Sequence, residues 1–209
     1  MEDDIDLGEE VISEALRLFD TAGIVSHGED NLVILGMATS SEQDLDDFIR
    51  DEHDRFFIHG FEIHIQPRLE SLVRLFRGKG LKTEILGRYG YPLKGGHNLK
   101  QLAVTAGLCN WGKNAMVLHP RLGPRFRLMA TKIVGATLPP TGPRKDSHEE
   151  NPLCQVCTTC IEACPLGILE PYYLSDRHSC LASTSGKRPG NVVGCNICWS
   201  VCPVGTPVT

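Results

Sequence analysis

The sequence lacks the features that mark several large protein classes. No apolar run reaches the roughly 20 residues of a membrane-spanning helix, and no signal peptide opens the chain. There is no Gly-x-Gly-x-x-Gly or Walker loop for a nucleotide, and the eight histidines show no His-x3-His or His-Glu-x2-His arrangement. We therefore expect a soluble, cytoplasmic protein with no membrane span, which is neither a zinc hydrolase nor a nucleotide-binding protein of those types.

Acidic residues are scarce in the middle of the chain. Between Arg68 and Lys132 there are 13 basic residues and only two acidic ones, Glu70 and Glu84, whereas residues 1–55 hold 17 acidic and 3 basic residues. The basic segment has two interpretations. It forms a surface for a polyanion, such as a phosphate-bearing cofactor, tRNA or an acidic redox partner, or it faces the acidic N-terminal segment within one fold. The sequence leaves both open.

Cysteine, in contrast, is abundant and closely spaced. Eight of the nine cysteines lie in two runs near the C-terminus. The first run reads Cys-x2-Cys-x2-Cys-x3-Cys-Pro and contains Cys154, Cys157, Cys160 and Cys164. The second ends in the same way and contains Cys180, Cys195, Cys198 and Cys202. This is the ligand spacing of bacterial ferredoxins, and it predicts two [4Fe–4S] clusters.

The spacing also predicts how the ligands divide. Three thiolates on one tight loop reach three irons of one cube, while the cysteine before the proline turns away and ligates the other cluster. One cluster is then held by Cys154, Cys157, Cys160 and Cys202. The other is held by Cys164, Cys195, Cys198 and, by elimination, Cys180. We expect Trp199, inside the second run, to shield a cluster from solvent.

Zinc and disulfides explain this pattern less well. A zinc ribbon needs four ligands in two Cys-x2-Cys pairs, and it does not require a Cys-Pro after three further cysteines, twice over. Disulfides are rare in a reducing cytoplasm. The ninth cysteine, Cys109, has no neighbouring cysteine in the sequence and is interpreted as a buried structural thiol. His119, which precedes a proline at the end of a strand, is likewise interpreted as structural.

The periodicity of apolar residues predicts an α+β fold. Helices are expected over residues 7–21, with Gly23 as the stop, from Ser40 toward Phe56, from Pro67 to Gly78 and over 99–106. The apolar stripe of the helix at Pro67 comprises Leu69, Leu72, Val73 and Phe76. Strands are expected over 31–37, 81–86, 116–118 and 130–134. This alternation suggests βαβ units. We predict an N-terminal α/β layered domain (1–138), a proline-rich linker (139–152) and a small ferredoxin-like domain with two clusters (153–209).

Three stretches resemble the epoxyqueuosine reductase family and, more distantly, the reductive dehalogenases. The first is Ala-Gly-Leu-x-x-x-Gly-Lys-Asn at 106–114, and the second is Gly-Pro-Arg-Phe-Arg-Leu at 123–128. The third runs from Glu-Pro-Tyr at 170–172 through Asp176 and Arg177 to Cys180, and then to Gly-Cys-x-x-Cys at 194–198. The resemblance covers about residues 60–203 and supports Cys180 as a ligand.

This resemblance implies a cobalamin-dependent reductase. Its N-terminal domain would hold a corrinoid above one cluster, and the second cluster would relay electrons from an outside donor. The residues expected to bind this cofactor are Gly107, Asn110, Gly112, Lys113 and Asn114. The glycines allow backbone to approach a large ligand closely. The segment ahead of this motif is short, which predicts a reduced corrinoid-type domain or a docking domain.

The family's catalytic aspartate has no counterpart in this sequence. Its expected place, at residues 91–96, reads Tyr-Pro-Leu-Lys-Gly-Gly. Without that acid, epoxide reduction on tRNA lacks its usual proton donor. Tyr89, Tyr91, Lys94 and His97 are the alternatives, and the sequence does not choose among them, so the catalytic residue stays unknown.

Two functions therefore follow from the sequence. The first is an iron–sulfur oxidoreductase that passes low-potential electrons through two clusters to a corrinoid or substrate in the N-terminal domain. The second is a non-catalytic, ferredoxin-like electron carrier or activator that docks on a redox protein and binds no cobalamin. Binding of tRNA without catalysis rests on the basic middle segment alone and predicts binding that weakens steeply as salt rises.

Overall fold

Two compact units make up the protein, and each draws on several stretches of the chain. The computed structural model describes residues 2–53, 55–91, 97–142, 150–176, 178–182, 190–191 and 195–205. The first unit comprises residues 1–37, 64–109 and 127–147. The second unit comprises residues 38–63, 110–126 and 148–209. All eight cysteines of the two runs belong to the second unit, whereas Cys109 belongs to the first.

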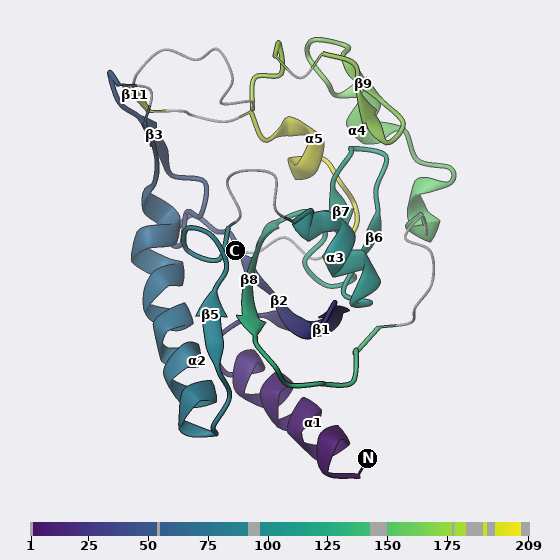
Figure 1. The fold of residues 1–209 in the computed structure, drawn as a ribbon. Helices are drawn as coiled ribbons and strands as arrows, with labels where there is room; N and C mark the ends of the chain where they lie inside the picture. Colours follow the sequence, from purple (N-terminus) through teal and green to yellow (C-terminus); the bar gives the residue numbers. More distant parts are fainter. Residues whose placement is uncertain are drawn as a thin grey trace. The chain divides into compact units, whose positions relative to one another are not determined.

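A four-stranded sheet forms the centre of the first unit (Figure 1). Its strands, in spatial order, are β1 (Thr21–His27), β2 (Asp30–Ala38), β8 (Phe126–Ile133) and β5 (Thr83–Ile85). Residues 31–38 of β2 are all buried, as expected for a continuous apolar run at the centre of a sheet. The buried strand predicted at 31–37 is confirmed.

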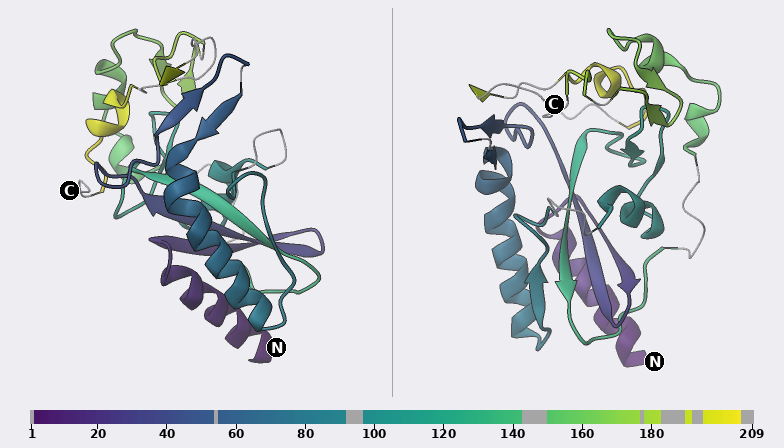
Figure 2. Two further views of the ribbon diagram at one scale, coloured as in Figure 1. Left: turned by 90° about the vertical axis from the view of Figure 1, so that its left-hand side faces the viewer. Right: turned by 45° about the horizontal axis from the view of Figure 1, so that its top comes forward.

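Three helices pack on this sheet. They are α1 (Glu2–Leu16), α2 (Gln66–Gly78) and α3 (Leu99–Thr105). Helices α1 and α3 both contact β1, from opposite sides of the sheet (Figure 2), and α2 contacts β5 and α1. The stripe predicted for the helix at Pro67 is confirmed, because Leu69, Leu72, Val73 and Phe76 are buried. The apolar core of the unit therefore lies between the helices and the sheet.

The start of the chain differs from the prediction. The first helix ends at Leu16, and residues 21–27 form strand β1, which the sequence analysis missed. Gly23 does not stop a helix but lies inside β1. A Cβ at this position would come 3.0 Å from the Cβ of Ala106 and 2.9 Å from Oγ1 of Thr141. The glycine therefore allows close packing of the sheet.

The βαβ expectation was also wrong for two of the strand pairs. Strands β1 and β2 form an antiparallel hairpin, with Thr21 opposite Gly36 and His27 opposite Asp30. Strand β5 is antiparallel to β8, with Thr83 opposite Ile133. Helix α2 precedes β5 and α3 follows it in the sequence, but the alternation of elements did not determine the strand direction.

The helix predicted from Ser40 to Phe56 is absent from this described part of the chain. Strands β3 (Phe48–Arg50) and β4 (Phe56–Ile58) stand there instead, paired in an antiparallel hairpin, and β11 (Gly190–Asn191) adds to β3. Ser40 Oγ accepts from the backbone N–H of Gln43, as a helix cap does, but the Gln43 side chain donates to the Ala38 carbonyl.

Aspartate side chains explain why no helix follows. Asp44 accepts a hydrogen bond from the backbone N–H of Asp46, and Asp51 accepts from those of His53 and Arg55. Such side-chain-to-backbone bonds stabilise turns in competition with helix. The apolar spacing alone could not reveal this competition.

Short elements build the rest of the second unit. They are β6 (Asn110–Trp111), β7 (Val117–Leu118), η2 (Pro152–Cys154), α4 (Thr159–Glu162), β9 (Leu169–Glu170), β10 (Tyr173–Leu174) and α5 (Ile197–Ser200), with the π-helix η1 (Phe61–Ile65) leading into α2. The whole is a mixed α and β fold. None of the helices among the described residues combines the length and apolar character needed to cross a membrane.

Candidate metal centre

The first cysteine run is carried by two very short helical turns. Asn151 caps η2 by accepting from the backbone N–H of Leu153 at 3.0 Å, and Cys154 ends that turn. Cys160 lies in α4 and Cys164 follows it. In the second run, Cys198 lies in α5 and Cys202 follows it. Helices α4 and α5 contact each other, so the two runs fold against one another.

Four cysteines line one pocket of the second unit. The lining residues are Cys154, Cys157, Cys160, Cys202, Lys113, Asn114, Leu118, Leu153, Pro203 and Val204. Burial raises the pKa of the Cys160 thiol, and the negative charges of Cys202, Cys154 and Cys157 raise it further. This pocket, which we call the cysteine pocket, therefore gathers the four residues that the spacing assigned to one cluster.

The remaining cysteines gather around Cys198. Burial, followed by the charges of Cys195, Cys160, Cys180 and Cys164, raises the pKa of Cys198 to about 11. Three of these four neighbours are the other predicted ligands of the second cluster. Concentrated negative charge of this kind needs a cationic partner when the thiols ionise, and a bound metal would supply that charge.

Cys164 has the opposite tendency. Burial by itself raises its pKa, but hydrogen bonds from backbone N–H groups of the following turn outweigh this effect and lower it. The donors are Leu166, Ile168, Leu169 and Gly167. Gly167 has a φ of +62°, the left-handed conformation that favours glycine. The turn after Cys164-Pro165 therefore stabilises a thiolate, the form that ligates iron.

Cys157 is also held in a setting that favours the thiolate. Its Sγ lies 3.4 Å from Oγ1 of Thr159, and this hydrogen bond is the main cause of its lowered pKa. The charge of Lys113 lowers the pKa further, while burial and Glu162 oppose these effects. Cys157 is thus prepared as a ligand by residues of both the first cysteine run and the 106–114 motif.

Residues of the 106–114 motif take part in the cysteine pocket. Lys113 Nζ donates to the Gln155 carbonyl at 3.2 Å. Asn114 is 5% exposed, and its Oδ1 accepts from the backbone N–H of Met116 at 3.1 Å. Within the described chain its Nδ2 is buried without a hydrogen-bond partner. A buried donor without a partner is costly, and a sulfur of a bound cluster would be an acceptor at this wall of the pocket.

The other predicted cofactor-binding residues lie apart from the pocket lining. Asn110 belongs to β6 and is paired with Leu118 of β7. Gly112 has no room for a side chain, because a Cβ would come 2.6 Å from Cδ1 of Leu118. Gly107 has a φ of +75° after α3 and belongs to the first unit. The motif is therefore divided between the two units, with residues 106–109 in the first and 110–114 in the second.

Three of the four candidate proton donors are described, all in the first unit. Tyr89 has a φ of +53° and lies under the guanidinium of Arg88, which is 5.0 Å from the ring centroid. Tyr91 is 44% exposed. The ring centroids of His97 and His27 are 4.7 Å apart, and burial followed by the charges of His27 and Lys132 lowers the pKa of His97. Lys94 lies outside the described residues, as do Arg177 and Gly194 of the third stretch.

Cys109 and His119 have structural settings. Cys109 is 4% exposed, and burial raises its pKa to about 12, so its thiol stays protonated. Nδ1 of His119 accepts from the backbone N–H groups of Arg121 and Leu122, each at 3.2 Å. Among the described residues, no three His, Cys, Asp or Glu side chains are arranged to hold a single metal ion.

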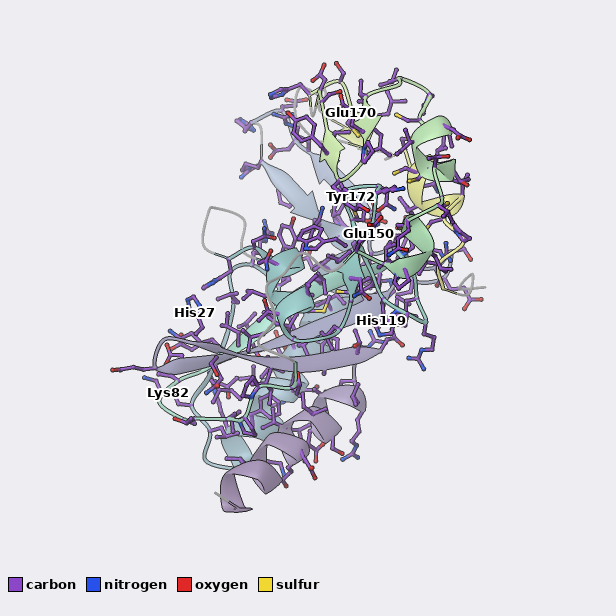
Figure 3. All side chains as sticks on the ribbon, turned by 90° about the vertical axis from the view of Figure 1, so that its right-hand side faces the viewer. His27, Lys82, His119, Glu150, Glu170 and Tyr172 are labelled. Carbon is purple, nitrogen blue, oxygen red and sulfur yellow. The ribbon has the colours of Figure 1, made fainter. Side chains whose placement is uncertain are left out.

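Sequence reasoning missed a tyrosine–glutamate pair near the cysteines. Tyr172 and Glu150 lie next to each other (Figure 3), and the backbone N–H of Tyr172 donates to the Lys113 carbonyl at 3.0 Å. Burial, the hydrogen bond to Glu150 and the charges of nearby cysteines raise the pKa of Tyr172. Its φ of +65° is unusual for a residue other than glycine. The Glu-Pro-Tyr motif at 170–172 contains Tyr172, but nothing in the sequence indicated that this tyrosine pairs with Glu150.

The second missed residue is Arg125, the arginine of the Gly-Pro-Arg motif. It is 8% exposed, and its guanidinium donates to four backbone carbonyls around Cys202. The sequence could not distinguish it from the other basic residues between Arg68 and Lys132, since burial is invisible in a charge count.

Comparisons with known proteins agree with this description. The chain is 32% identical over 113 residues to an epoxyqueuosine reductase of Leadbetterella byssophila, an alignment that covers 48% of this chain and 35% of the relative. It is 31% identical over 116 residues to an epoxyqueuosine reductase of Cyclobacterium marinum, covering 50% and 36%. The aligned parts thus span about a third of these curated relatives. No family model matches the chain.

The fold resembles that of a solved structure over nearly the whole chain. A crystal structure of an epoxyqueuosine reductase with a tRNA-Tyr epoxyqueuosine-modified tRNA stem loop superposes with a TM-score of 0.66 at 21% identity, covering 95% of this chain and 65% of that one. At this identity the likeness shows a shared fold. Together with the curated relatives, it supports the resemblance that the motifs indicated.

Proposed function

We propose that this chain, which resembles the epoxyqueuosine reductases, is an iron–sulfur oxidoreductase with two [4Fe–4S] clusters. Electrons of low potential would pass through the clusters to a corrinoid or a substrate bound by the N-terminal part of the chain. The single observation that carries this proposal is the grouping of the eight cysteines in two sets. One set surrounds the cysteine pocket, and the other surrounds Cys198.

The donor set fits iron–sulfur clusters chemically. Thiolates are the ligands that such clusters take, four to each cube. Groups of the second unit lower the pKa of two of these thiols. Backbone N–H groups do so for Cys164, and Thr159 and Lys113 do so for Cys157. The unpartnered amide of Asn114 at the cysteine pocket would gain an acceptor on cluster binding. A cluster, when bound, accepts and releases single electrons.

The chain's own residues would exclude water and hold the ligands in place. Leu118 and Val204 are buried with Cys154, and Cys202 packs against them. This apolar wall lowers the local dielectric at the cysteine pocket and thereby strengthens every electrostatic interaction there. Lys113 is the cation that lines the pocket. It would compensate part of the negative charge of the four thiolates and bound cluster.

The corrinoid part of the proposal has its own test. We would titrate the anaerobic, iron-reconstituted protein with cob(II)alamin and follow absorbance and EPR. A base-off spectrum that saturates near one cobalamin per chain would support a corrinoid reductase. The candidate proton donors Tyr89, Tyr91 and His97 would then be replaced one at a time. No binding, with both clusters intact, would contradict the corrinoid part of the proposal.

A second function is favoured by a specific observation. Residues 91–96 contain no carboxylate where the family has its catalytic aspartate, so the chain lacks the family's proton donor. An electron carrier or activator that docks on a redox protein needs no such donor. Reduction of the clusters by a partner without turnover of any cobalamin would favour this alternative.

Binding of tRNA is the third part of the proposal. It is supported by the basic segment between Arg68 and Lys132 and by the relative whose crystal structure contains a tRNA stem loop. Contacts to phosphates make binding fall steeply with salt. We expect a tRNA stem loop to bind the holoprotein at low salt and to dissociate as salt rises. Binding that is independent of salt, or none at low salt, would contradict this part.

A further inference from the structure

The buried guanidinium of Arg125 makes several hydrogen bonds whose role the proposed function does not explain. Its Nη1 donates to the carbonyls of Trp199 at 3.1 Å and Cys202 at 3.3 Å. Its Nη2 donates to the carbonyls of Val204 at 3.0 Å and Gly205 at 3.2 Å. Four backbone acceptors on one segment, which we call the 199–205 segment, are thus held by a single side chain.

The acceptors of Arg125 lie at and beyond the C-terminal end of helix α5. The carbonyls of Cys202, Val204 and Gly205 follow the helix, and that of Trp199, in its last turn, also accepts from the backbone N–H of Cys202. A cation at a helix C-terminus is favourable electrostatically as well as through hydrogen bonds. Arg125 therefore fixes the backbone that runs from Cys198 to Cys202, ligands that the spacing assigns to different clusters.

A second contact holds the same segment without any side chain. Gly123 has a φ of +60°, and a Cβ there would lie 1.9 Å from the Val204 carbonyl oxygen. Gly205 has a φ of +79°, and a Cβ there would lie 2.2 Å from the backbone N of Gly123. The two backbones touch directly, so the chain just before Arg125 is held against the chain that follows Cys202.

The hydrogen bonds of Arg125 connect it more directly to one cysteine set than to the other. Two of its four acceptors are the carbonyls of Cys202 and Val204, and both residues line the cysteine pocket. Its contact toward the other set is the carbonyl of Trp199, which is not a predicted ligand. The guanidinium therefore places a positive charge beside the Cys202 end of the cysteine pocket.

We propose that Arg125 is a positioning residue that also raises the reduction potential of the cluster held by Cys154, Cys157, Cys160 and Cys202, so that the first electron entering the protein rests on that cluster. This inference depends on the proposed function. With a cluster bound there, the step would be a one-electron reduction from [4Fe–4S]2+ to [4Fe–4S]1+ by the external electron donor, in which no bond forms or breaks. With four thiolates the charge would change from −2 to −3, and the cation of Arg125 would stabilise the more negative form.

The test is a potentiometric EPR titration of the reconstituted holoprotein, with titanium(III) citrate as reductant. Arg125→Gln removes the charge and keeps an amide donor, whereas Arg125→Lys keeps the charge and loses the planar fork. Arg121→Gln is the control, because Arg121 is an exposed arginine of the same loop. We expect Arg125→Gln to lower the ratio of reduced to oxidised cluster about tenfold at a fixed potential, which is about 59 mV for one electron.

The charge-conserving variant separates charge from structure. Arg125→Lys should stay within about threefold of the wild type, and Arg121→Gln should not change the ratio, because its charge is screened by solvent. Equal shifts in Arg125→Gln and Arg125→Lys would overturn the inference, since a purely structural role predicts that result. An unchanged potential in Arg125→Gln with about eight irons bound would overturn it as well.

A second measurement does not depend on the Arg125 variants folding. In the wild type, the EPR signal that appears first during reduction should be the one altered by Cys154→Ser. If Cys195→Ser alters the first signal instead, the inference is wrong. A wild-type protein that takes up no iron at all would refute the proposed function and the inference together, so the two failures are distinguishable.

Discussion

The close approach of two backbones at Gly123 allows a sharp test of the structure around Cys202. We expect Gly123→Ala to destabilise the protein strongly and to release iron. The added Cβ would lie 1.9 Å from the Val204 carbonyl oxygen, whereas such carbon–oxygen contacts are normally about 3.3 Å or longer. The 199–205 segment would therefore have to move by more than about 1 Å, and Cys202 would move with it.

Gly167→Ala is the matched control. Gly167 lies in the same unit and has a φ of +62°, close to the +60° of Gly123, but a Cβ there meets nothing within 4 Å. Both variants place an alanine in the left-handed region, which costs about 1–2 kcal/mol. Only Gly123→Ala adds the steric overlap, and overpacking typically costs a further 1–3 kcal/mol, roughly.

These free energies translate into different melting temperatures. For a chain of this size, 1 kcal/mol lowers Tm by roughly 2–4 °C. We expect Gly167→Ala to lower the midpoint by about 2–8 °C and Gly123→Ala to lower it by about 1.5 to 4 times as much as Gly167→Ala does. Loss of absorbance near 400 nm reports the clusters and circular dichroism reports the backbone, both at one scan rate because metal release makes unfolding irreversible. Equal effects of the two substitutions would refute the close backbone contact.

Three further predictions concern the ligands, the pocket wall and pH. Cys160→Ser should remove about four irons, because a cube takes four thiolates. Cys109→Ala should retain about eight irons, because Cys109 lies in the other unit. Iron and sulfide analysis measures the metal content of both variants. Asn114→Asp replaces the unpartnered Nδ2 with a negative oxygen and should therefore lower both iron retention and reduction potential. Burial and nearby charges lower the pKa of His97 below 6.5. The unfolded state therefore binds a proton at this residue more readily, and the stability of the protein should fall as the pH drops below 6.5. In His97→Gln, Tm should decrease less steeply over the same pH range.

Each of these predictions has an outcome that would contradict it. Loss of about four irons from Cys109→Ala would overturn the ligand assignment. For the pocket wall, Asn98→Asp is the control, because its Oδ1 keeps the cap of α3; equal iron loss in both variants would show that Asn114 has no special contact. For His97, a Tm that falls equally steeply below pH 6.5 in the variant would assign the proton uptake to other groups.

The gathering of the cysteines could be predicted because their close spacing is typical of cluster-binding loops, whereas the assignment of ligands to each cluster stays a prediction. The structure gathers Cys154, Cys157 and Cys160 with Cys202, residues that are far apart in the sequence. The buried strand at 31–37 and the helix at Pro67 were predictable for a similar reason, since a strong apolar pattern needs no tertiary information. The strand and the helix are encoded locally, whereas the approach of Cys202 to the first cysteine run also needs long-range contacts.

The features that the sequence did not reveal depend on long-range contacts. Strand β1 was missed because its glycine is a packing position rather than a helix stop. The segment from Ser40 to Phe56 has helix-like spacing, but aspartate turns compete with the helix there. The role of Arg125 depends on four carbonyls more than 70 residues away, which no periodicity can indicate.

The division into units also depends on contacts distant in sequence. The predicted C-terminal segment, 153–209, falls wholly in the second unit, but this unit also contains 38–63 and 110–126. The motif at 106–114 is therefore split between the units, with Lys113 and Asn114 at the cysteine pocket. Sequence order alone would have kept that motif in one N-terminal domain.

The central claim is that the chain holds two [4Fe–4S] clusters, and metal analysis of the anaerobically reconstituted protein tests it most directly. Iron and acid-labile sulfide would be quantified together with a Mössbauer spectrum. We predict about eight irons and eight sulfides per chain, all in [4Fe–4S] clusters. One or two metal ions per chain without sulfide, as in a zinc-binding protein, would contradict the account.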